Sequence, residues 1–86
     1  MSKEQKRKDR LTKTPPPKDF RWEELVSVMN DFGFEFDSSS GGSHGHFVLK
    51  SDKDKTISSY RPHPSGIMYS IQLKEIVKKL KEWGML

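Results

Sequence analysis

The sequence contains no cysteine, which excludes disulfide bonds, thiolate metal ligands and a cysteine nucleophile. It also contains no apolar run near the roughly 20 residues that a membrane helix needs, and no apolar secretion signal at its start. Hydrophobic residues make up only 31% of the 86 residues, against 33% charged residues. We therefore expect one small cytoplasmic domain with a thin core and no deep substrate cleft.

Excess charge is confined to the N-terminal part of the chain. Residues 1–19 carry seven Lys or Arg and three Asp or Glu, whereas residues 20–86 carry nine of each sign. After the initiator Met, Leu11 is the one apolar side chain before the stiff Pro15-Pro16-Pro17 spacer. We predict a disordered basic tail over residues 1–19 and a folded domain over residues 20–86. The tail either steers nucleic acid or is a solubilising extension.

Hydrophobic periodicity predicts two helices separated by three strands. Apolar residues recur at i, i+3, i+4 and i+7 from Trp22 to Met29, which predicts a helix over about 20–32. The period then falls to two, which predicts strands over about 34–37, 44–50 and 56–61, and a second amphipathic helix follows over about 70–83. The simplest packing is an α+β fold of order α-β-β-β-α, with both helices on one face of a three-stranded antiparallel sheet.

Two histidines lie on the predicted second strand. His44 and His46 are two residues apart, so their rings project from one face, and the predicted packing leaves that face uncovered by helices. Histidine exchanges protons near neutral pH and can act as a general base or acid on RNA. The alternative is that both are ordinary surface residues.

A zinc site is a further alternative, since His44, His46 and a distant His63 supply three imidazoles. The sequence lacks cysteine ligands and has no Asp or Glu at an obvious supporting position. We therefore expect no metal and no other cofactor.

Three lysines form a stripe on the last predicted helix. Lys74, Lys78 and Lys81 repeat at i, i+4 and i+7, and their charge is of the kind that contacts phosphate. Lysines on a helix surface are more often simply solvated, and Glu75 with Lys79 supports the helix by an i, i+4 pair. Both interpretations stay open at this point.

Four segments of the chain resemble the HicA family of bacterial toxins, the small endoribonucleases of type II toxin–antitoxin systems. They are Asp31-Phe32-Gly33-Phe34, Gly42-Ser43-His44-Gly45-His46-Phe47, Pro62-His63-Pro64, and the closing helix from Leu73 to Trp83-Gly84. The resemblance covers roughly residues 20–86. Many members have a second His directly after the first, where this chain has Gly45, and compact members lack residues 1–19.

The resemblance implies a fold similar to double-stranded RNA-binding domains, cleavage of mRNA, and a HicB-like antitoxin that covers the site. It also implies that His44 is the catalytic residue, and we expect His46 to assist it. Attack by the ribose 2′-hydroxyl on the adjacent phosphate suits such a base. We predict RNA contacts at the following residues: Gly42, Ser43, Arg61, Lys74, Lys78 and Lys81.

Two other functions compete with a nuclease. One is a non-catalytic RNA-binding module of the same fold, in which His44 only contacts RNA. The other is a protein-interaction domain that receives a partner strand at a sheet edge. Retained RNA binding without cleavage favours the first, and absence of RNA binding even at low salt favours the second.

Overall fold

The computed structural model of the chain describes residues 3–38 and 44–86. Its elements, in chain order, are α1 (Lys3–Leu11), α2 (Trp22–Asp31), β1 (Phe34–Asp37), β2 (His44–Leu49), β3 (Asp52–Tyr60) and α3 (Ser70–Glu82). From α2 onward the order is helix, three strands, helix, which confirms the predicted α+β fold. One further helix, α1, precedes this unit.

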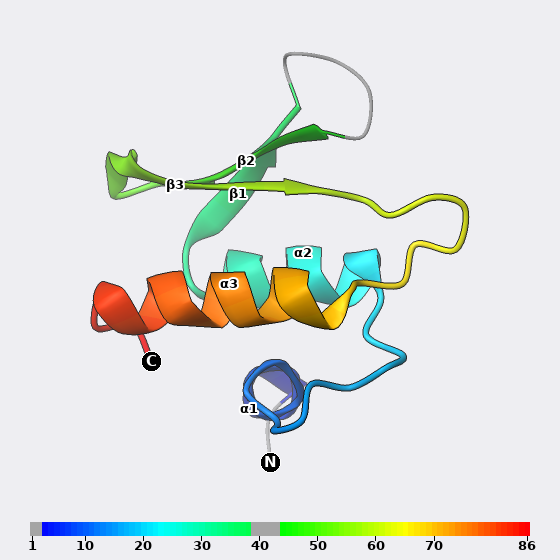
Figure 1. Ribbon diagram of the computed structural model, residues 1–86. Coiled ribbons are helices and arrows are strands. Elements are labelled where there is room, and N and C mark those ends of the chain that lie inside the picture. Colours follow the sequence, from blue (N-terminus) through cyan, green and yellow to red (C-terminus); the bar gives the residue numbers. More distant parts are fainter. Residues whose placement is uncertain (1–2, 39–43) are drawn as a thin grey trace.

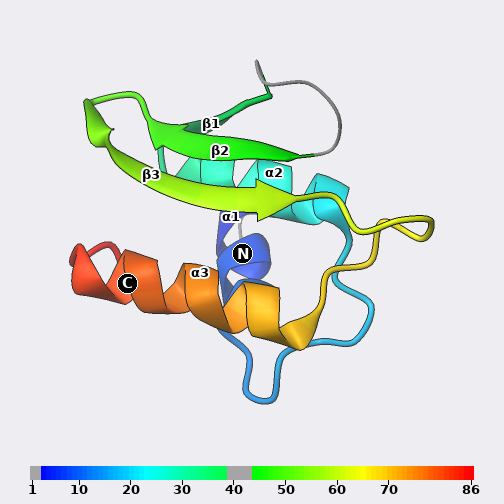
Figure 2. The ribbon, with the colours of Figure 1, turned by 45° about the horizontal axis from the view of Figure 1, so that its top comes forward.

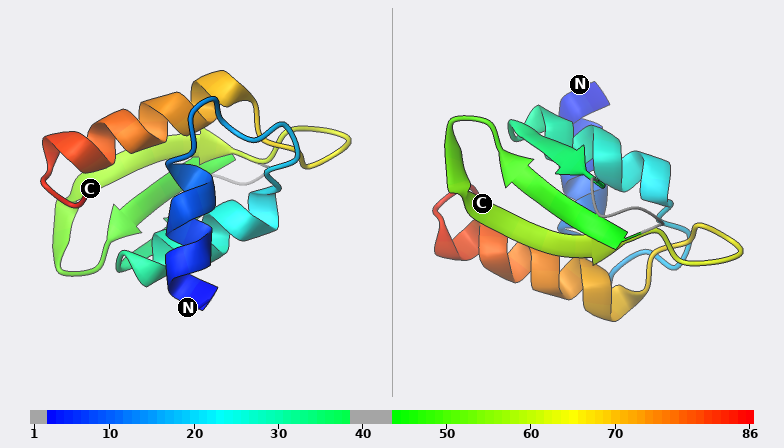
Figure 3. Two further views of the ribbon diagram at one scale, coloured as in Figure 1. Left: turned by 90° about the horizontal axis from the view of Figure 1, so that it is seen from below. Right: turned by 90° about the horizontal axis from the view of Figure 1, so that it is seen from above.

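The elements are stacked in three layers. The strands form an antiparallel meander of order β1-β2-β3, and α2 and α3 lie together against one of its faces (Figure 1). On the side away from the sheet, α1 lies across α2, and the segment that follows α1 passes over α3 (Figure 3, left). Within residues 3–38 and 44–86, no helix lies on the opposite face of the sheet (Figure 3, right), so both predicted helices cover a single face.

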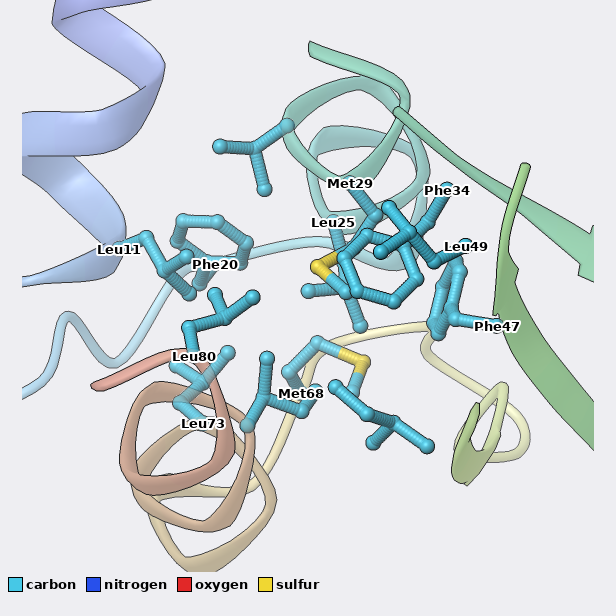
Figure 4. Packing of buried hydrophobic residues seen from close by; sticks show 13 residues of the cluster. Leu11, Phe20, Leu25, Met29, Phe34, Phe47, Leu49, Met68, Leu73 and Leu80 are labelled. Carbon is cyan, nitrogen blue, oxygen red and sulfur yellow. The ribbon is translucent and has the colours of Figure 1, made fainter. Parts of the chain in front are cut away.

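The core extends from the sheet, past α2 and α3, to Leu11 of α1 (Figure 4). Helix α2 contributes residues three and four apart to this core, and α3 does the same, because that spacing places side chains on one stripe of a helix. The buried hydrophobic residues of the described chain are Leu11, Phe20, Leu25, Val28, Met29, Phe34, Phe47, Leu49, Ile57, Met68, Leu73, Ile76 and Leu80.

The strand pairing decides which side chains face the helices. Phe36 pairs with Phe47, and Phe47 in turn pairs with Ile57, so the three residues share the helix-facing side of the sheet. The third strand begins at Asp52, earlier than predicted, because the chain reverses over Lys50 and Ser51 only. An irregularity between Val48 and Leu49 shifts the register of β2 and β3.

A short backbone pairing ties the start of α2 to the segment before α3. The Trp22 N–H donates to the Gly66 carbonyl at 2.8 Å, and the Met68 N–H donates to the Phe20 carbonyl at 2.7 Å. Gly66 has a φ of +72°, which side chains with a Cβ rarely adopt. The pairing ties the start of α2 to the segment that leads into α3, and both helices contribute buried apolar residues to the core.

The predicted disorder of residues 1–19 is wrong for residues 3–11, which form α1. Arg7 donates to both carboxylate oxygens of Asp31 at 2.7 and 3.0 Å, and Arg10 donates to both oxygens of Glu24 at 2.7 and 3.1 Å. Leu11 is 1% exposed. Low hydrophobicity suggested disorder, but paired charges and one buried leucine offset the ordering entropy here.

These ion pairs also affect the arginines themselves. The pKa of Arg7 is raised above its ordinary value mainly because Arg7 donates hydrogen bonds to Asp31. The pKa of Arg10 is raised mainly by its hydrogen bonds to Glu24. Both guanidinium groups therefore neutralise the acidic face of α2 at any physiological pH.

Candidate functional site

The two histidines of β2 lie on the uncovered face of the sheet, as predicted. Along this strand the burial alternates: His44 and His46 are exposed, whereas Phe47 and Leu49 are buried. Figure 2 shows the outer face of β2 and β3 with no helix over it. Both imidazoles are therefore accessible to a large ligand such as a nucleic-acid strand.

His44 is paired with Tyr60 on the neighbouring strand β3. The two rings are stacked, with centroids 5.1 Å apart and planes inclined by 28°. Stacking of this kind contributes about 0.5–1.5 kcal/mol and limits the orientations of both rings. Tyr60 therefore holds the His44 imidazole in a defined position at the end of the strand.

The stacked pair borders a shallow recess on the open face. The recess has a volume of about 370 Å³, and the described residues that form its walls belong to β2 and β3. Its lining residues are His44, Gly45, His46, Ser58, Ser59 and Tyr60. A recess with two imidazoles, a hydroxyl and an aromatic ring can accept a nucleotide by stacking and hydrogen bonding.

Gly45 lies between the two histidines but on the buried side of the strand. A Cβ at this position would lie 2.4 Å from the Asp37 carbonyl oxygen and 2.7 Å from Cζ of Phe36. Such contacts are too short for any side chain. A second histidine at position 45, directly after His44, is therefore excluded sterically. Position 45 faces the Asp37 backbone and the Phe36 ring.

Charge on the open face is uneven. In the register of β1 and β2, Glu35 lies opposite Val48 and Asp37 lies opposite His46. Both carboxylates therefore share the outer face with the histidines, on the β1 side. Because carboxylates repel phosphate, a nucleic-acid strand is expected to run over β2 and β3 and away from β1.

The predicted RNA-contact residues do not form one cluster around His44. Gly42 and Ser43 lie outside the described residues. Arg61 follows Tyr60 directly, and its guanidinium lies against Gly66 in the next turn, where a Cβ on the glycine would be 2.7 Å from Nη2. These RNA contacts stay predictions.

The lysine stripe lies on a different side of the molecule. Lys74, Lys78 and Lys81 line a groove between α3 and the segment after α1, below the helix layer rather than on the open sheet face. Their contact with RNA also stays a prediction.

The residues that the structure describes do not form a metal site. Across residues 3–38 and 44–86, no three side chains of His, Asp or Glu are grouped so that they could hold a metal ion. The three histidines therefore do not make the zinc site that their number allowed. His63 lies in the exposed loop after β3.

Sequence reasoning missed Tyr60 and Ser58 as members of the site. The alternation of the third strand does place both on the face opposite Ile57. That alternation could have suggested them, but only the strand register shows that Tyr60 lies beside His44 and Ser58 beside His46.

A comparison with protein-family models matches most of the chain. A family model described as the HicA toxin of bacterial toxin–antitoxin matches residues 22–85, which include every element from α2 to α3. Searches of curated proteins and of solved structures returned no significant match. Among the helices formed by the described residues, none has the length and apolar character needed to cross a bilayer.

Proposed function

Because the chain belongs to the HicA toxin family of bacterial toxin–antitoxin systems, we propose that it is an endoribonuclease that cleaves mRNA with His44 as general base and acid. The observation that carries this proposal is the exposed His44 ring, held by Tyr60 beside an open recess on an uncovered sheet face. The family implies an antitoxin partner and an RNA substrate.

The proposed reaction uses imidazole side chains of the chain and the 2′-hydroxyl of the RNA. Neutral His44 takes the proton of a ribose 2′-hydroxyl, whose oxygen attacks the adjacent phosphorus while the bond to the 5′-oxygen breaks. A protonated imidazole then gives a proton to the leaving 5′-oxygen. The products are a 2′,3′-cyclic phosphate and a 5′-hydroxyl. A positioned base of this kind increases the reaction rate about 10²–10⁴-fold.

His46 is the second imidazole available for the leaving group. It lies two residues from His44 on the same face, about 7 Å along an extended strand. That spacing would allow the two imidazoles to lie on opposite sides of one phosphate group. We propose that His46 assists His44 and that Ser58, opposite His46, contributes a hydroxyl to the same recess.

RNA binding is proposed to use the β2–β3 side of the sheet. Tyr60 offers a ring on which a base can stack, and Arg61 lies next to it in the chain. Gly42 and Ser43 precede His44 directly and stay proposed contacts of the RNA backbone. A HicB-like antitoxin that covers this face would block the recess, and the reaction belongs in the cytoplasm, where mRNA is found.

The proposal is tested with wild type and His44→Ala, expressed from a tightly repressed promoter in a bacterial host. Growth and mRNA integrity are followed together, and the purified proteins are given a synthetic RNA. We expect wild type to arrest growth and cleave RNA, and His44→Ala to bind RNA without cleaving it. His63→Ala is the matched control, because His63 is exposed and lies outside the recess.

Two results would contradict the proposed nuclease activity. One is a folded wild-type protein that neither arrests growth nor cleaves RNA, which would leave a binding module. The other is cleavage of an all-deoxy substrate at a similar rate, because DNA lacks the 2′-hydroxyl that the mechanism requires.

A further inference from the structure

A second concave surface lies on the side of the helix layer away from the sheet. It is a groove of about 680 Å³ between α3 and the segment that follows α1. Figure 3 (left) shows this segment passing across α3 next to the end of α1. The groove and the His44 recess share no residue, and the helix layer and the sheet lie between them.

The bottom of the groove is aliphatic. Leu11 and Leu73 are fully buried and close it, while Pro16 and Val77 are half-buried and leave apolar surface open. None of the described residues that line the groove is aromatic. A nucleic-acid base would therefore find no ring on which to stack, whereas leucine or isoleucine side chains of a peptide would find an aliphatic surface.

The rim of the groove is cationic. Lys13, Lys74, Lys78 and Lys81 line it and are exposed, and none of them forms an ion pair in the part of the chain that the structure describes. Glu82 also lines the groove, but its carboxylate lies 4.0 Å from Nζ of Lys79. The net charge around the aliphatic bottom is therefore strongly positive.

We propose that this groove binds an acidic amphipathic helix of a protein partner. The apolar face of such a helix would cover Pro16 and Val77, and its carboxylates would lie within reach of the four lysines. Combined aliphatic and cationic character selects a peptide of this class, since an RNA strand would use the lysines and leave the apolar bottom exposed. The inference does not depend on the proposed nuclease activity.

The location of the groove has a functional consequence. A partner helix bound in this groove leaves the outer face of β2 and β3 open. The segment after α1, which lines the groove together with α3, and the sheet lie on opposite sides of α3 (Figure 1). Binding at the groove and access to His44 are therefore independent. A partner can recruit or anchor the chain through this surface without blocking the recess.

The test measures fluorescence anisotropy of a labelled peptide added to the full chain. The probe is a designed amphipathic helix with leucines at i, i+3, i+4 and i+7 and glutamates elsewhere, compared with a scrambled peptide of the same composition. We expect the helix to bind more tightly than the scrambled peptide. Lys78→Glu should weaken binding about tenfold, since it replaces an attraction with a repulsion, and Val77→Asp should weaken it similarly.

The matched control is Lys53→Glu, which makes the same charge change at an exposed residue of the β2–β3 hairpin. This variant and His44→Ala should bind the peptide like wild type, and circular dichroism checks that each variant is folded. Equal weakening by Lys53→Glu would overturn the proposal in favour of nonspecific attraction. Absence of peptide binding, with Lys78→Glu instead weakening a single-stranded RNA oligonucleotide, would overturn it in favour of a nucleic-acid surface.

Discussion

The rings of His44 and Tyr60 are stacked across the β2–β3 pair, with their centroids 5.1 Å apart. The two residues are direct partners in the strand register, so the backbone and not only the side chains keeps them together. A flexible surface imidazole would have to be ordered again for each reaction. Stacking reduces that ordering cost, and this gives Tyr60 a positioning role that can be separated from catalysis.

Replacing Tyr60 should therefore lower the rate of RNA cleavage without abolishing it. Tyr60→Ala removes the stack, worth about 0.5–1.5 kcal/mol, and should slow single-turnover cleavage about two- to tenfold. Tyr60→Phe keeps the ring and should stay near wild type. Tyr69→Ala is the control, because Tyr69 is 53% exposed and does not line the recess. An equal loss with Phe and Ala would assign the effect to the hydroxyl instead.

A side chain at position 45 should destabilise the fold. Gly45→Ala places a Cβ against the Asp37 carbonyl and the Phe36 ring, and should cost about 1–3 kcal/mol in the free energy of unfolding. Gly45→His, which would restore two adjacent histidines, should cost more and should not raise activity. Urea unfolding measures both, with His46→Ala on the exposed face as control. A stable, more active Gly45→His variant would contradict this account.

Removing the buried leucine of α1 should release that helix. Leu11 is 1% exposed, and Leu11→Ala should lower the free energy of unfolding by about 2–4 kcal/mol. Leu86→Ala provides the comparison, since Leu86 is 39% exposed and should change stability by less than about 0.5 kcal/mol. Hydrogen exchange should show the same difference in the protection of α1 amides. If both leucine variants were equally stable, α1 would not be docked as described.

The hairpin between β2 and β3 should contribute a pH-dependent term to stability. The pKa of Asp52 is lowered mainly by its hydrogen bond from Lys55, at 2.7 Å, and also by the backbone N–H of Asp54. A lowered carboxyl pKa stabilises the folded state above the ordinary carboxyl pKa of about 4, and this contribution is lost as the pH falls through the lowered value.

Urea midpoints of wild type and Asp52→Asn should therefore differ at neutral pH and converge in acid. Asp54→Asn removes a carboxylate from the same hairpin and serves as control. Because Asp52 and Lys55 are both partly exposed, the difference should be small and should shrink in high salt. A difference that grows in acid would have the wrong sign for this interaction.

Much of the architecture followed from periodicity alone. The spacing of apolar residues located α2 and α3, and the alternation along the second strand placed His44 and His46 on the side opposite Phe47 and Leu49. Local geometry is sufficient for such predictions, because helix and strand periods fix which side chains share a face. The simplest packing of these amphipathic helices also placed both of them on one side of the sheet, which left the histidine face open.

The docking of α1 could not be predicted in this way. Residues 3–11 contain one apolar side chain, and their basic composition is typical of disorder. What orders them is the acidic face of α2, in particular Asp31 and Glu24, together with an apolar site for Leu11. Such complementarity exists only once α2 and α3 have packed, so composition within the segment itself carries no sign of it.

The sequence by itself determined that two imidazoles face solvent on a sheet, whereas only the tertiary structure decided what lies beside them. If the pairing of Leu49 with Asp52 continued without interruption, His44 would lie opposite Ile57. The irregularity between Val48 and Leu49 moves the partner to Tyr60, three residues further along. A bulge depends on how β3 packs on the core, which the residue pattern of one strand does not encode.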